Sequence, residues 1–456
     1  MQKLISRVGV AGIGWMDALW IGAAVFLVTY ALISIRRLPG IRIDRPAAAL
    51  LGAGLMLVFG VVSPEAAIDA INMDIVLLLV GMMLLVAGLE LCGFFEWVSL
   101  WMIRHSKSQF QLLVLTMVVT GALSALVLND TVVLLFTPII IRTCRLLKSN
   151  PIPFLIAEAV AANIGSVGTV VGNPQNAYIA TKAGISFVDF SAKLLPVSAV
   201  CMAVAILMLH LFYRKELETG SSQEVRKEIS ELGWDEFQKK ILGNNSSSEV
   251  SVNRMEARRT GLIVLLGITG VTFVAFVGSH ALETPVAVIA FLAGTAAVFV
   301  LPIVSDVKTK DMLAGVDWSI ILFFVGLFIV IAGVKACGLL EAMSDFFPGF
   351  GAGTVPTPAW LTALSAVLAN LVSNVPAVML LSEMIPLSQA DLYLVLASSS
   401  TLAGNATILG AAANVIVAEK AEAMGVEVGF WKFAIVGFPI AMVTLFVSTL
   451  LLSLIL

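Results

Sequence analysis

The stretch QFQLLVLTMVVTGALSALVLNDTVVLLFTPIIIRTCR, residues 109–145, decides the fold of this chain. It is apolar on both sides of Asn129-Asp130-Thr131, Arg104 precedes it, and Arg142 lies near its end. Positive residues stay on the cytoplasmic side of a membrane, so both ends lie on one face. Polar backbone at membrane depth needs protein around it, because hydrocarbon offers no hydrogen-bond partners. The stretch therefore predicts a hairpin that enters the membrane and returns.

Three further apolar regions are broken in the middle. Ser373-Asn374, followed by Pro376, interrupts 360–388 and predicts a second re-entrant hairpin. Gly172-Asn173-Pro174-Gln175-Asn176 interrupts 154–184, and Gly404-Asn405-Ala406-Thr407 interrupts 392–420. These last two regions predict membrane spans with unwound centres. Four such breaks imply one enclosed polar cavity.

The composition is that of a membrane protein. The 456 residues are 59% hydrophobic and 12% charged, with a mean hydropathy of +1.01, whereas a soluble domain is about 25% charged. The net charge of −3, without a basic cluster among exposed aromatics, argues against a nucleic-acid partner. Runs of about 20 apolar residues cross a bilayer. Such runs lie at 18–35, 47–63, 75–95, 194–213, 261–279, 285–303, 317–336 and 433–455.

With the two broken spans, these runs predict an all-α, multi-pass protein of the inner (plasma) membrane. It has about ten transmembrane helices, two re-entrant hairpins and both termini outside. The polar linker 214–260 then lies inside. Its apolar residues recur at helical spacing and predict an interfacial amphipathic helix; they are Val225, Ile229, Leu232, Phe237 and Ile241.

The chain also contains an internal repeat. At an offset of 245, Gly81, Gly88, Cys92, Gly93, Glu96 and Asn129 match identical residues, and at 238 Thr169, Gly172 and Asn176 match Thr407, Gly410 and Asn414. The crossings per copy are odd in number, so the copies have inverted topology, which is typical of secondary transporters with a midplane site. The predicted division is N-terminal spans 1–70, repeat 71–213, linker 214–260, linker spans 261–314 and repeat 315–456.

These motifs resemble the ion transporter superfamily of arsenite permeases, NhaD-type sodium/proton antiporters and divalent anion/sodium symporters, over about Ile71 to the C-terminus. The symporters carry Ser-Asn-Thr at their hairpin tips; here 128–131 and 373–376 keep the Asn and displace the Thr. The runs 93–97, 135–139 and 211–215 are most similar to the ArsB-type arsenite efflux permease branch. The resemblance implies an elevator-type carrier, in which hairpins and broken helices move against a dimeric scaffold.

Candidate substrate ligands lie at the four breaks. Amides offer both donors and acceptors, and hydroxyls and free carbonyls hold cations. The predicted substrate-binding residues are Asn129, Asn374, Ser373, Asn173, Asn176, Asn405, Thr407 and Asn414. The same groups could instead bind a sodium ion; the residues predicted for that site are Asn129, Asn173, Asn374 and Asn405. The alternative for the two hairpin asparagines is helix capping.

The coupling candidates are Asp130, Thr169 and Glu158. A carboxylate at membrane depth usually marks an ion or proton pathway, which favours Asp130. Its alternative is to cap the returning hairpin helix. Glu158 is equally consistent with carrying a proton and with lying near the cytoplasmic interface, because Pro151 places the start of its helix close by.

Two repeat-equivalent pairs receive simpler interpretations. Glu90 and Lys335 end equivalent spans, and snorkelling to the interface is favoured over a salt bridge within the scaffold. Cys92 and Cys337 are predicted to be small buried hydrophobes rather than thiol ligands of arsenic.

The sequence thus predicts a secondary active transporter that exports arsenite or antimonite in exchange for protons. Arsenous acid is neutral at pH 7, and no Arg or Lys is predicted at the breaks. The alternatives are a cation-coupled carrier of a small oxyanion or carboxylate, and a sodium/proton antiporter. The predicted partners are the small oxyanion or neutral oxyacid, the bilayer, a second copy in a homodimer and, because a P-loop is missing, a separate ATPase subunit for any ATP-driven pumping. No catalytic residue and no cofactor beyond the coupling H⁺ or Na⁺ is expected.

Overall fold

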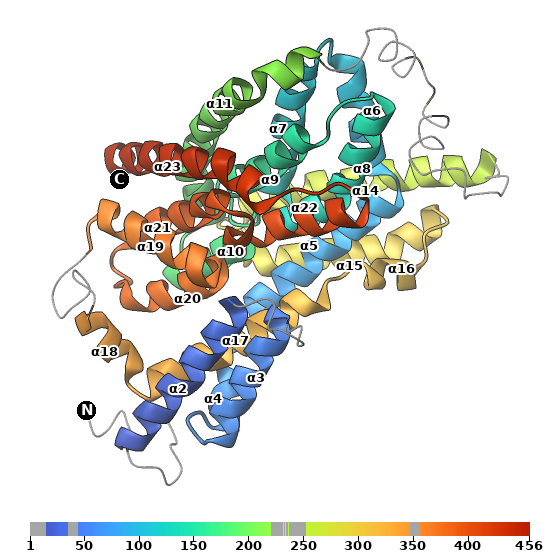
Figure 1. Ribbon diagram of the computed structural model, residues 1–456. Coiled ribbons are helices and arrows are strands. Elements are labelled where there is room, and N and C mark those ends of the chain that lie inside the picture. Colours follow the sequence, from blue (N-terminus) through green and yellow to red (C-terminus); the bar gives the residue numbers. More distant parts are fainter. Residues whose placement is uncertain are drawn as a thin grey trace.

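The computed structural model describes residues 15–34, 44–219, 231, 233, 236, 252–346 and 356–456, and all the regular structure in them is helical. The predicted amphipathic helix of the linker falls outside this part of the chain, apart from Glu231, Gly233 and Glu236. The first half contains α2 Trp15–Ser34, α3 Arg45–Val58, α4 Pro64–Asp69, α5 Met73–Leu91, α6 Phe94–His105, α7 Gln109–Leu126, α8 Asn129–Leu146, α9 Ile152–Ser166, α10 Pro174–Ala183 and α11 Phe187–Thr219 (Figure 1).

The second half repeats this order. It contains α14 Val252–Gly278, α15 Val286–Val304, α16 Thr309–Ala314, α17 Trp318–Ala336, α18 Leu339–Phe346, α19 Pro358–Val372, α20 Asn374–Met384, α21 Ala390–Ala403, η1 Gly404–Ala406, η2 Ile408–Gly410, α22 Ala412–Ala423 and α23 Phe430–Ile455. The correspondence extends upstream of the sequence identities, because α2, α3 and α4 precede α5 as α14, α15 and α16 precede α17.

The predicted fold class is confirmed. α7 and α8 form the first hairpin and α19 and α20 the second, and both predicted broken spans are interrupted, between α9 and α10 and between α21 and α22. Eight helices of the described chain are long and apolar enough to cross a membrane. The span predicted over 47–63 is shorter, because α3 ends at Val58 and Gly60 then takes a φ of 67°, a left-handed conformation that suits glycine.

Two helix groups compose the molecule. The hairpin group comprises α7–α11 and α19–α23, in which α7 packs on α9, α19 on α21, α8 on α22 and α11 on α23. The flanking group comprises α2–α5 and α14–α17. Here the halves are exchanged, since α5 packs on α15 and α17 packs on α3. Contacts of α10 with α5 and of α19 with α2 join the two groups.

Glycines allow the exchanged helices to approach closely. A Cβ on Gly326 of α17 would lie 2.7 Å from the carbonyl carbon of Ala49 in α3. At the repeat-equivalent contact, a Cβ on Gly294 of α15 would lie 2.6 Å from the carbonyl oxygen of Gly81 in α5. Backbones this close have no room for a larger side chain, as at many membrane helix crossings. Gly326 follows Gly81 by 245 residues, and Gly294 follows Ala49 by 245 residues. The two contacts are therefore equivalent under the offset found in the sequence.

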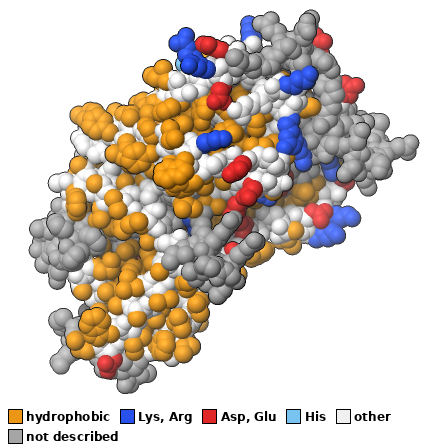
Figure 2. All heavy atoms as spheres, viewed as in Figure 1, with side chains coloured by type: hydrophobic (Ala, Val, Ile, Leu, Met, Phe, Trp, Pro, Cys, Tyr) orange, Lys and Arg blue, Asp and Glu red, His pale blue; other side chains and the backbone are white. Residues whose placement is uncertain are grey.

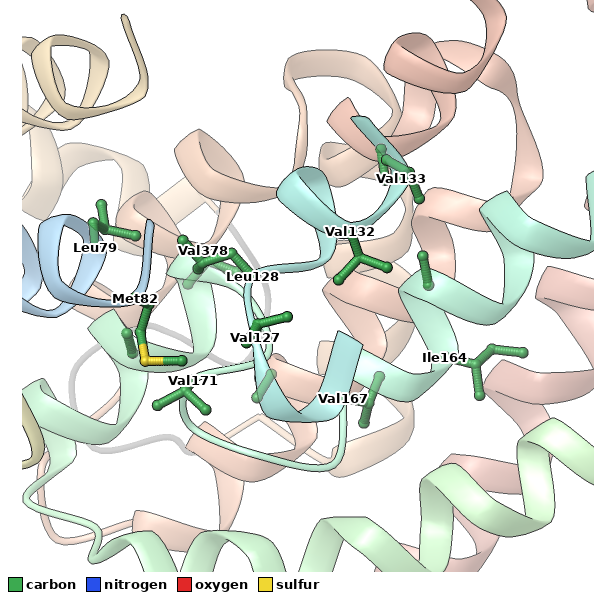
Figure 3. Packing of buried hydrophobic residues seen from close by; sticks show 14 of the residues in the cluster. Leu79, Met82, Val127, Leu128, Val132, Val133, Ile164, Val167, Val171 and Val378 are labelled. Atoms are coloured by element: carbon green, nitrogen blue, oxygen red, sulfur yellow. The ribbon is translucent and has the colours of Figure 1, made fainter. Parts of the chain in front are cut away.

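The outer surface suits lipid. Figure 2 shows hydrophobic side chains over most of the visible face, with charged side chains gathered toward one end. Large apolar side chains on α2, α14, α15 and α23 are exposed; among them are Trp20, Val274, Phe299 and Leu454. Inside, the first hairpin tip packs in a buried apolar cluster, where Val127 and Leu128 lie with Val171 of the first break and Val378 of the second hairpin (Figure 3).

Candidate functional site

Each hairpin tip is attached to the break of its own repeat. The backbone N–H of Asn129 donates to the Gly172 carbonyl over 2.9 Å. With its amide nitrogen turned toward the backbone, Asn374 donates to the carbonyl of Gly410, the equivalent of Gly172, over 3.0 Å. The tips and breaks therefore form one polar junction.

The threonines of the breaks complete this attachment. The Thr169 hydroxyl donates to the Ala125 carbonyl over 2.5 Å. The Thr407 hydroxyl donates to Oδ1 of Asn370, at the position equivalent to Ala125, over 3.4 Å. Both hydroxyls thus hold a hairpin to its broken helix.

Asn176 and Asn414 hold the unwound backbone in shape. Nδ2 of Asn176 donates to the carbonyls of Ser166 and Thr169 over 2.8 and 3.0 Å. Nδ2 of Asn414 donates to the equivalent carbonyls of Gly404 and Thr407 over 2.7 and 2.9 Å. Buried carbonyls without a helical partner need such donors. The amide nitrogens of both residues are therefore committed to the breaks.

Asn163 connects the two repeats, and sequence reasoning missed it. The side chain is fully buried in α9, and its Nδ2 donates to Oδ1 of Asn405 and of Asn414, each over 2.9 Å. Its own Oδ1 accepts from Asn129 over 3.4 Å. Its only sequence signal is a lone amide in the apolar first half of a broken helix.

Asn173 and Asn405 complete the junction. Asn173 caps α10 by accepting from the Asn176 backbone N–H over 2.8 Å, and its Nδ2 donates to Ser166. Among the described residues, Nδ2 of Asn405 and Oδ1 of Asn176 are buried without a partner. Buried polar atoms are nearly always paired, so these two atoms mark places for an ion, a water or substrate.

A cavity of about 220 Å³ lies where the two tips meet the flanking group. It brings together four of the predicted residues with several others. Its polar walls are Asn129, Asp130, Gln175, Ser373 and Asn374 from the hairpin group, and Arg45, Asp317 and Ser319 from the flanking group. Seven predicted residues line none of the three cavities described here; they are the coupling candidates Thr169 and Glu158 and the amides and hydroxyl Asn173, Asn176, Asn405, Thr407 and Asn414.

Asp130 lies in the first turn of α8 and lines the cavity together with Ala412, the first residue of α22. The N-termini of two helices from different repeats therefore meet at this cavity, where their dipoles favour a negative charge. Asp317 begins α17 and accepts from the backbone N–H of Ser319 over 2.9 Å. One carboxylate belongs to the hairpin group and the other to the flanking group.

Arg45 corrects one inference from the sequence, namely that the site lacks a cation. Arg45 begins α3 and lines the cavity, and its Nε is buried without a partner among the described residues. The sequence did not identify Arg45 as a site residue, because it belongs to a run of arginines that is typical of the cytoplasmic interface. The cavity therefore has one basic and two acidic side chains in its walls.

Ser373 forms the second hairpin tip in a strained conformation. Its φ is 78° and its ψ is 158°, whereas Leu128 at the first tip has a φ of −55°. Residues other than glycine rarely take a positive φ, and such strain concentrates at ligand sites. This backbone conformation reverses the chain direction within one residue, and Ser373 lines the cavity.

Glu158 lies apart from this cavity. It is fully buried in α9, with the Thr137 hydroxyl 3.0 and 3.1 Å from its two carboxylate oxygens. It lines none of the three cavities described here. Its surroundings suit a neutral carboxyl group in a packed core.

A second cavity, of about 680 Å³, adjoins the site on the side that the Lys/Arg distribution predicts to be cytoplasmic. It shares Asp317 and Ser319 with the smaller cavity and extends along α8 to Arg142. Arg45 and Asp317 begin α3 and α17 at their cytoplasmic ends, yet they lie level with the hairpin tips. With the orientation that the Lys/Arg distribution predicts, the described conformation is the one open to the inside.

The cysteines are packing residues. All four are buried and free. A Cβ on Gly22 of α2 would lie 2.5 Å from Sγ of Cys337, and one on Gly261 of α14 would lie 3.0 Å from Sγ of Cys92. Each thiol thus fills the space above a glycine of the other half. Within the part of the chain that is described, no three His, Cys, Asp or Glu residues gather into a metal site.

Comparisons with known proteins agree with this architecture. Residues 30–392 match a protein family described as citrate transporter. The chain is 30% identical to the silicon efflux transporter LSI3 of Oryza sativa subsp. japonica, covering 92% of this chain and 95% of that one. It is 26% identical to the putative transporter arsB of Dictyostelium discoideum, over 91% and 88% of the two chains. The YdaH transporter of Alcanivorax borkumensis, described as having an unusual topology, has a similar fold, with a TM-score of 0.50 at 14% identity over 96% and 97% of the chains.

These matches span nearly the whole chain, and they are to transporters rather than enzymes. Together with the inverted halves, the paired hairpins and the polar cavity between them, they lead to one conclusion. This chain is a multi-pass membrane carrier that belongs to the citrate transporter family of the ion transporter superfamily, with ArsB-like and silicon efflux transporters among its relatives.

Proposed function

We propose that this protein is a secondary carrier that exports small uncharged oxyacids, arsenous or antimonous acid foremost, in exchange for protons. The observation that carries the proposal is the charge of the cavity walls. Arg45 contributes one guanidinium to these walls, and Asp130 and Asp317 contribute two carboxylates. Such walls disfavour a multiply charged anion, while the amides of Asn129 and Asn374 offer donors and acceptors to hydroxyl groups.

The relatives support this substrate class. One is named a silicon efflux transporter and another a putative arsB transporter. Silicic acid and arsenous acid are both small hydroxy acids that are uncharged near neutral pH. A cavity of about 220 Å³ accommodates either of them together with water.

Asp130 is the proposed proton carrier. It lines the same cavity as the two tip asparagines, and the N-terminus of α22 borders that cavity, where its dipole favours the charged form of the carboxylate. A proton that arrives from outside neutralises the carboxylate while the site faces outward, and the carboxylate releases it inside when substrate binds. Thr169 and the tip asparagines are the proposed sodium ligands for the alternative in which sodium replaces the proton.

An elevator movement is the proposed mechanism. The hairpin group carries the tips and both breaks, and it meets the flanking group through few helix pairs. Sliding the hairpin group outward would move the cavity away from Arg45 and Asp317 and expose it to the other side. We further propose that the flanking group forms the interface of a homodimer. A peripheral ATPase subunit is not required for this cycle.

Arg45 favours a second candidate, the cation-coupled transport of a carboxylate or a small oxyanion. A guanidinium binds carboxylates in a two-pronged geometry, and the matching family is described as citrate transporter. In that case Arg45 would provide a direct ligand, and sodium at the tip asparagines would balance the added negative charge.

Uptake into inside-out proteoliposomes distinguishes the candidates. Arsenite, antimonite, silicic acid, phosphate, succinate and citrate would each be tested under separately imposed proton and sodium gradients. Saturable entry of arsenite driven by an acid interior supports the oxyacid exporter. Sodium-driven uptake of citrate or succinate, with arsenite inert, would replace it with the carboxylate carrier.

A further inference from the structure

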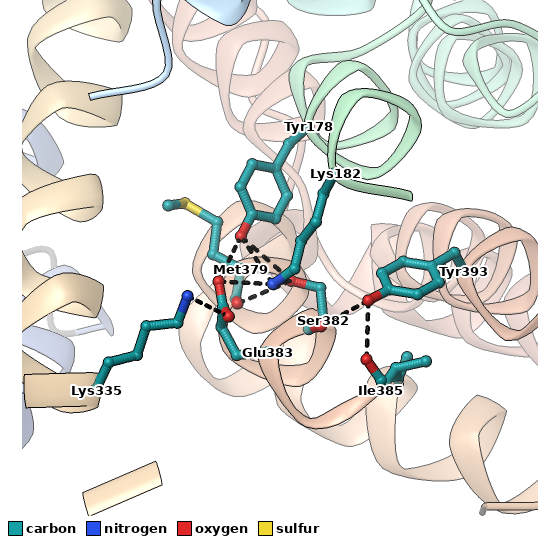
Figure 4. A network of polar contacts seen from close by, with 8 residues as sticks. All are labelled: Tyr178, Lys182, Lys335, Met379, Ser382, Glu383, Ile385 and Tyr393. Carbon is teal, nitrogen blue, oxygen red and sulfur yellow. Dashed lines mark hydrogen bonds and ion pairs between the residues drawn. The ribbon is translucent and has the colours of Figure 1, made fainter. Parts of the chain in front are cut away.

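A cluster of charged residues lies near the C-terminal ends of α10, α17 and α20 (Figure 4). None of them lines the substrate cavity, and the Lys/Arg distribution predicts that these helix ends face outward. Nζ of Lys182 lies 2.6 Å from Oε1 of Glu383, and Nζ of Lys335 lies 2.5 Å from Oε2 of the same carboxylate. The Tyr178 hydroxyl donates to Oε1 of Glu383 over 3.1 Å. We call Lys182, Glu383 and Lys335 the outer cluster.

The outer cluster joins the two helix groups. Glu383 ends the second hairpin and Lys182 lies on α10, so both belong to the hairpin group. Lys335 lies at the outer end of α17, in the flanking group. The side chain of Glu383 is only 11% exposed, whereas that of Lys335 is 48% exposed. The Lys335–Glu383 ion pair therefore joins a nearly buried carboxylate of one group to a half-exposed lysine of the other, a partner that the sequence did not predict for Lys335.

The repeat places a matching set of residues at the inner ends. At an offset of 245, Lys335 corresponds to Glu90 of α5, and at 238 Lys182 corresponds to Lys420 of α22. Glu383 corresponds to Pro138 of α8, and Arg142 follows Pro138 by one helical turn. We call Glu90, Lys420 and Arg142 the inner cluster. Its signs are reversed, since the flanking group now supplies the acid and the hairpin group supplies the bases.

The inner cluster is open where the outer cluster is closed. Glu90, Pro138, Arg142 and Lys420 all line the 680 Å³ cavity on the cytoplasmic side. Among the described residues, no ion pair joins Glu90 to Arg142 or Lys420. In carriers built from inverted repeats, alternating access moves one bundle against the other around the binding site. A movement that closes the inner cavity would bring its charges together.

We propose that the two clusters are alternating ion-pair latches for transport. In the inward-open state, Glu383 of the hairpin group holds Lys335 of the flanking group. In the outward-open state, this pair separates, and Glu90 of the flanking group pairs with Lys420 or Arg142. Because one latch forms as the other breaks, the electrostatic cost of separating one pair is offset by closing the other. The two states can then remain within a small free-energy difference, as a carrier requires.

This inference rests on the elevator movement proposed above, so the first experiment tests the movement alone. Glu90→Cys with Arg142→Cys would be cross-linked in membranes by a short bifunctional thiol reagent. These two residues form no ion pair in the described state, so a cross-link that forms faster when substrate and a proton gradient drive turnover reports the movement. Failure to form it, while Lys335→Cys with Glu383→Cys does cross-link, would overturn both the movement and the latches.

The second experiment tests the charges. Leu135 lines the cytoplasmic cavity, and a Leu135→Cys reporter would be labelled from the inside by a membrane-impermeant maleimide. The four native cysteines are buried, so protein without the reporter serves as the blank. Lys335→Gln and Glu383→Gln should each slow labelling roughly threefold or more, because each shifts the population outward. Lys335→Gln leaves the Lys182–Glu383 pair intact, so the hairpin group stays folded.

The matched control is Asp391→Asn. Asp391 pairs with Lys193 over 3.0 Å, and both residues lie within the hairpin group, so this change should leave labelling unchanged. Adding Glu90→Gln to Glu383→Gln should restore the labelling rate toward wild type, since both latches are then weakened. Equal labelling of wild type, Lys335→Gln and Glu383→Gln, with the first cross-link formed, would overturn the latches and leave the movement standing. A double variant labelled as slowly as Glu383→Gln alone would also overturn them.

Discussion

Replacing Asn163 by alanine tests whether this residue joins the two repeats. The change removes two hydrogen bonds of 2.9 Å and one of 3.4 Å, and it leaves acceptors on Asn405 and Asn414 and a donor on Asn129 in a buried site. A buried hydrogen bond contributes about 1 kcal/mol net, and an orphaned partner costs about 1–3 kcal/mol. The space left by the amide can hold a water that re-pairs part of them. We expect a loss of about 2–4 kcal/mol.

The measurement is the thermal unfolding midpoint of the purified carrier in detergent, followed by helical circular dichroism. The matched control is Gln389→Ala, which removes an exposed amide with no side-chain hydrogen bond among the described residues. Asn163→Ala should unfold several degrees below wild type, and the control should unfold with wild type. Asn163→Leu fills the space but leaves the same polar groups of the neighbouring asparagines unpaired. It should therefore be no more stable than Asn163→Ala. If Asn163→Ala is as stable as the control, the proposed connection between the repeats is wrong.

Four other changes probe the site. Asp130→Asn should abolish proton-driven arsenite uptake but keep substrate binding, measured by proteoliposome flux and by ligand-induced thermal shift; persistent proton coupling would exclude Asp130 as the carrier. Arg45→Gln should change the half-saturating arsenite concentration less than about threefold, since a neutral ligand gains little from a guanidinium, whereas a loss of about 2–5 kcal/mol in binding would indicate an anionic substrate. Ser373→Gly should raise the free energy of unfolding by about 1 kcal/mol by relieving the positive φ, and an unfolding midpoint below wild type would show that the hydroxyl matters more. Glu158→Gln should keep uptake within roughly twofold of wild type, because a neutral amide replaces a buried carboxyl without a basic partner; lost proton coupling would return Glu158 to the pathway.

The membrane architecture was predictable from the sequence because a few polar residues interrupt long apolar runs. Asn129 and Ser373-Asn374 mark the hairpin tips in this way, and the offsets of 245 and 238 identify their equivalents. The same offsets predict that Asn176 and Asn414 occupy equivalent positions. The sequence does not show that both donate hydrogen bonds to carbonyls of the breaks. The apolar runs, their polar interruptions and the internal repeat were therefore sufficient to predict the fold.

The other site residues come from contacts that no local pattern records. Arg45 belongs by sequence to an interfacial basic run and reaches the cavity only because the flanking group lies level with the tips. Asn163 is a lone amide in an apolar helix, and its partners lie in the other repeat. Lys335 has a partner on a hairpin that is distant in sequence. Each depends on how the two halves dock, which the spacing within either half does not specify.

The exchanged packing of the flanking helices bears on how this protein is made. α5 packs against α15 and α17 packs against α3, so each of these helices has its packing partner in the other half. While the first half emerges from the ribosome, the bare face around Gly81 contacts lipid or a chaperone until α15 is inserted. The scaffold is thus assembled late in synthesis, and the first half alone should be a substrate for membrane proteolysis. By the same reasoning, two half-chains divided in the polar linker and synthesised together should find each other and restore a working carrier.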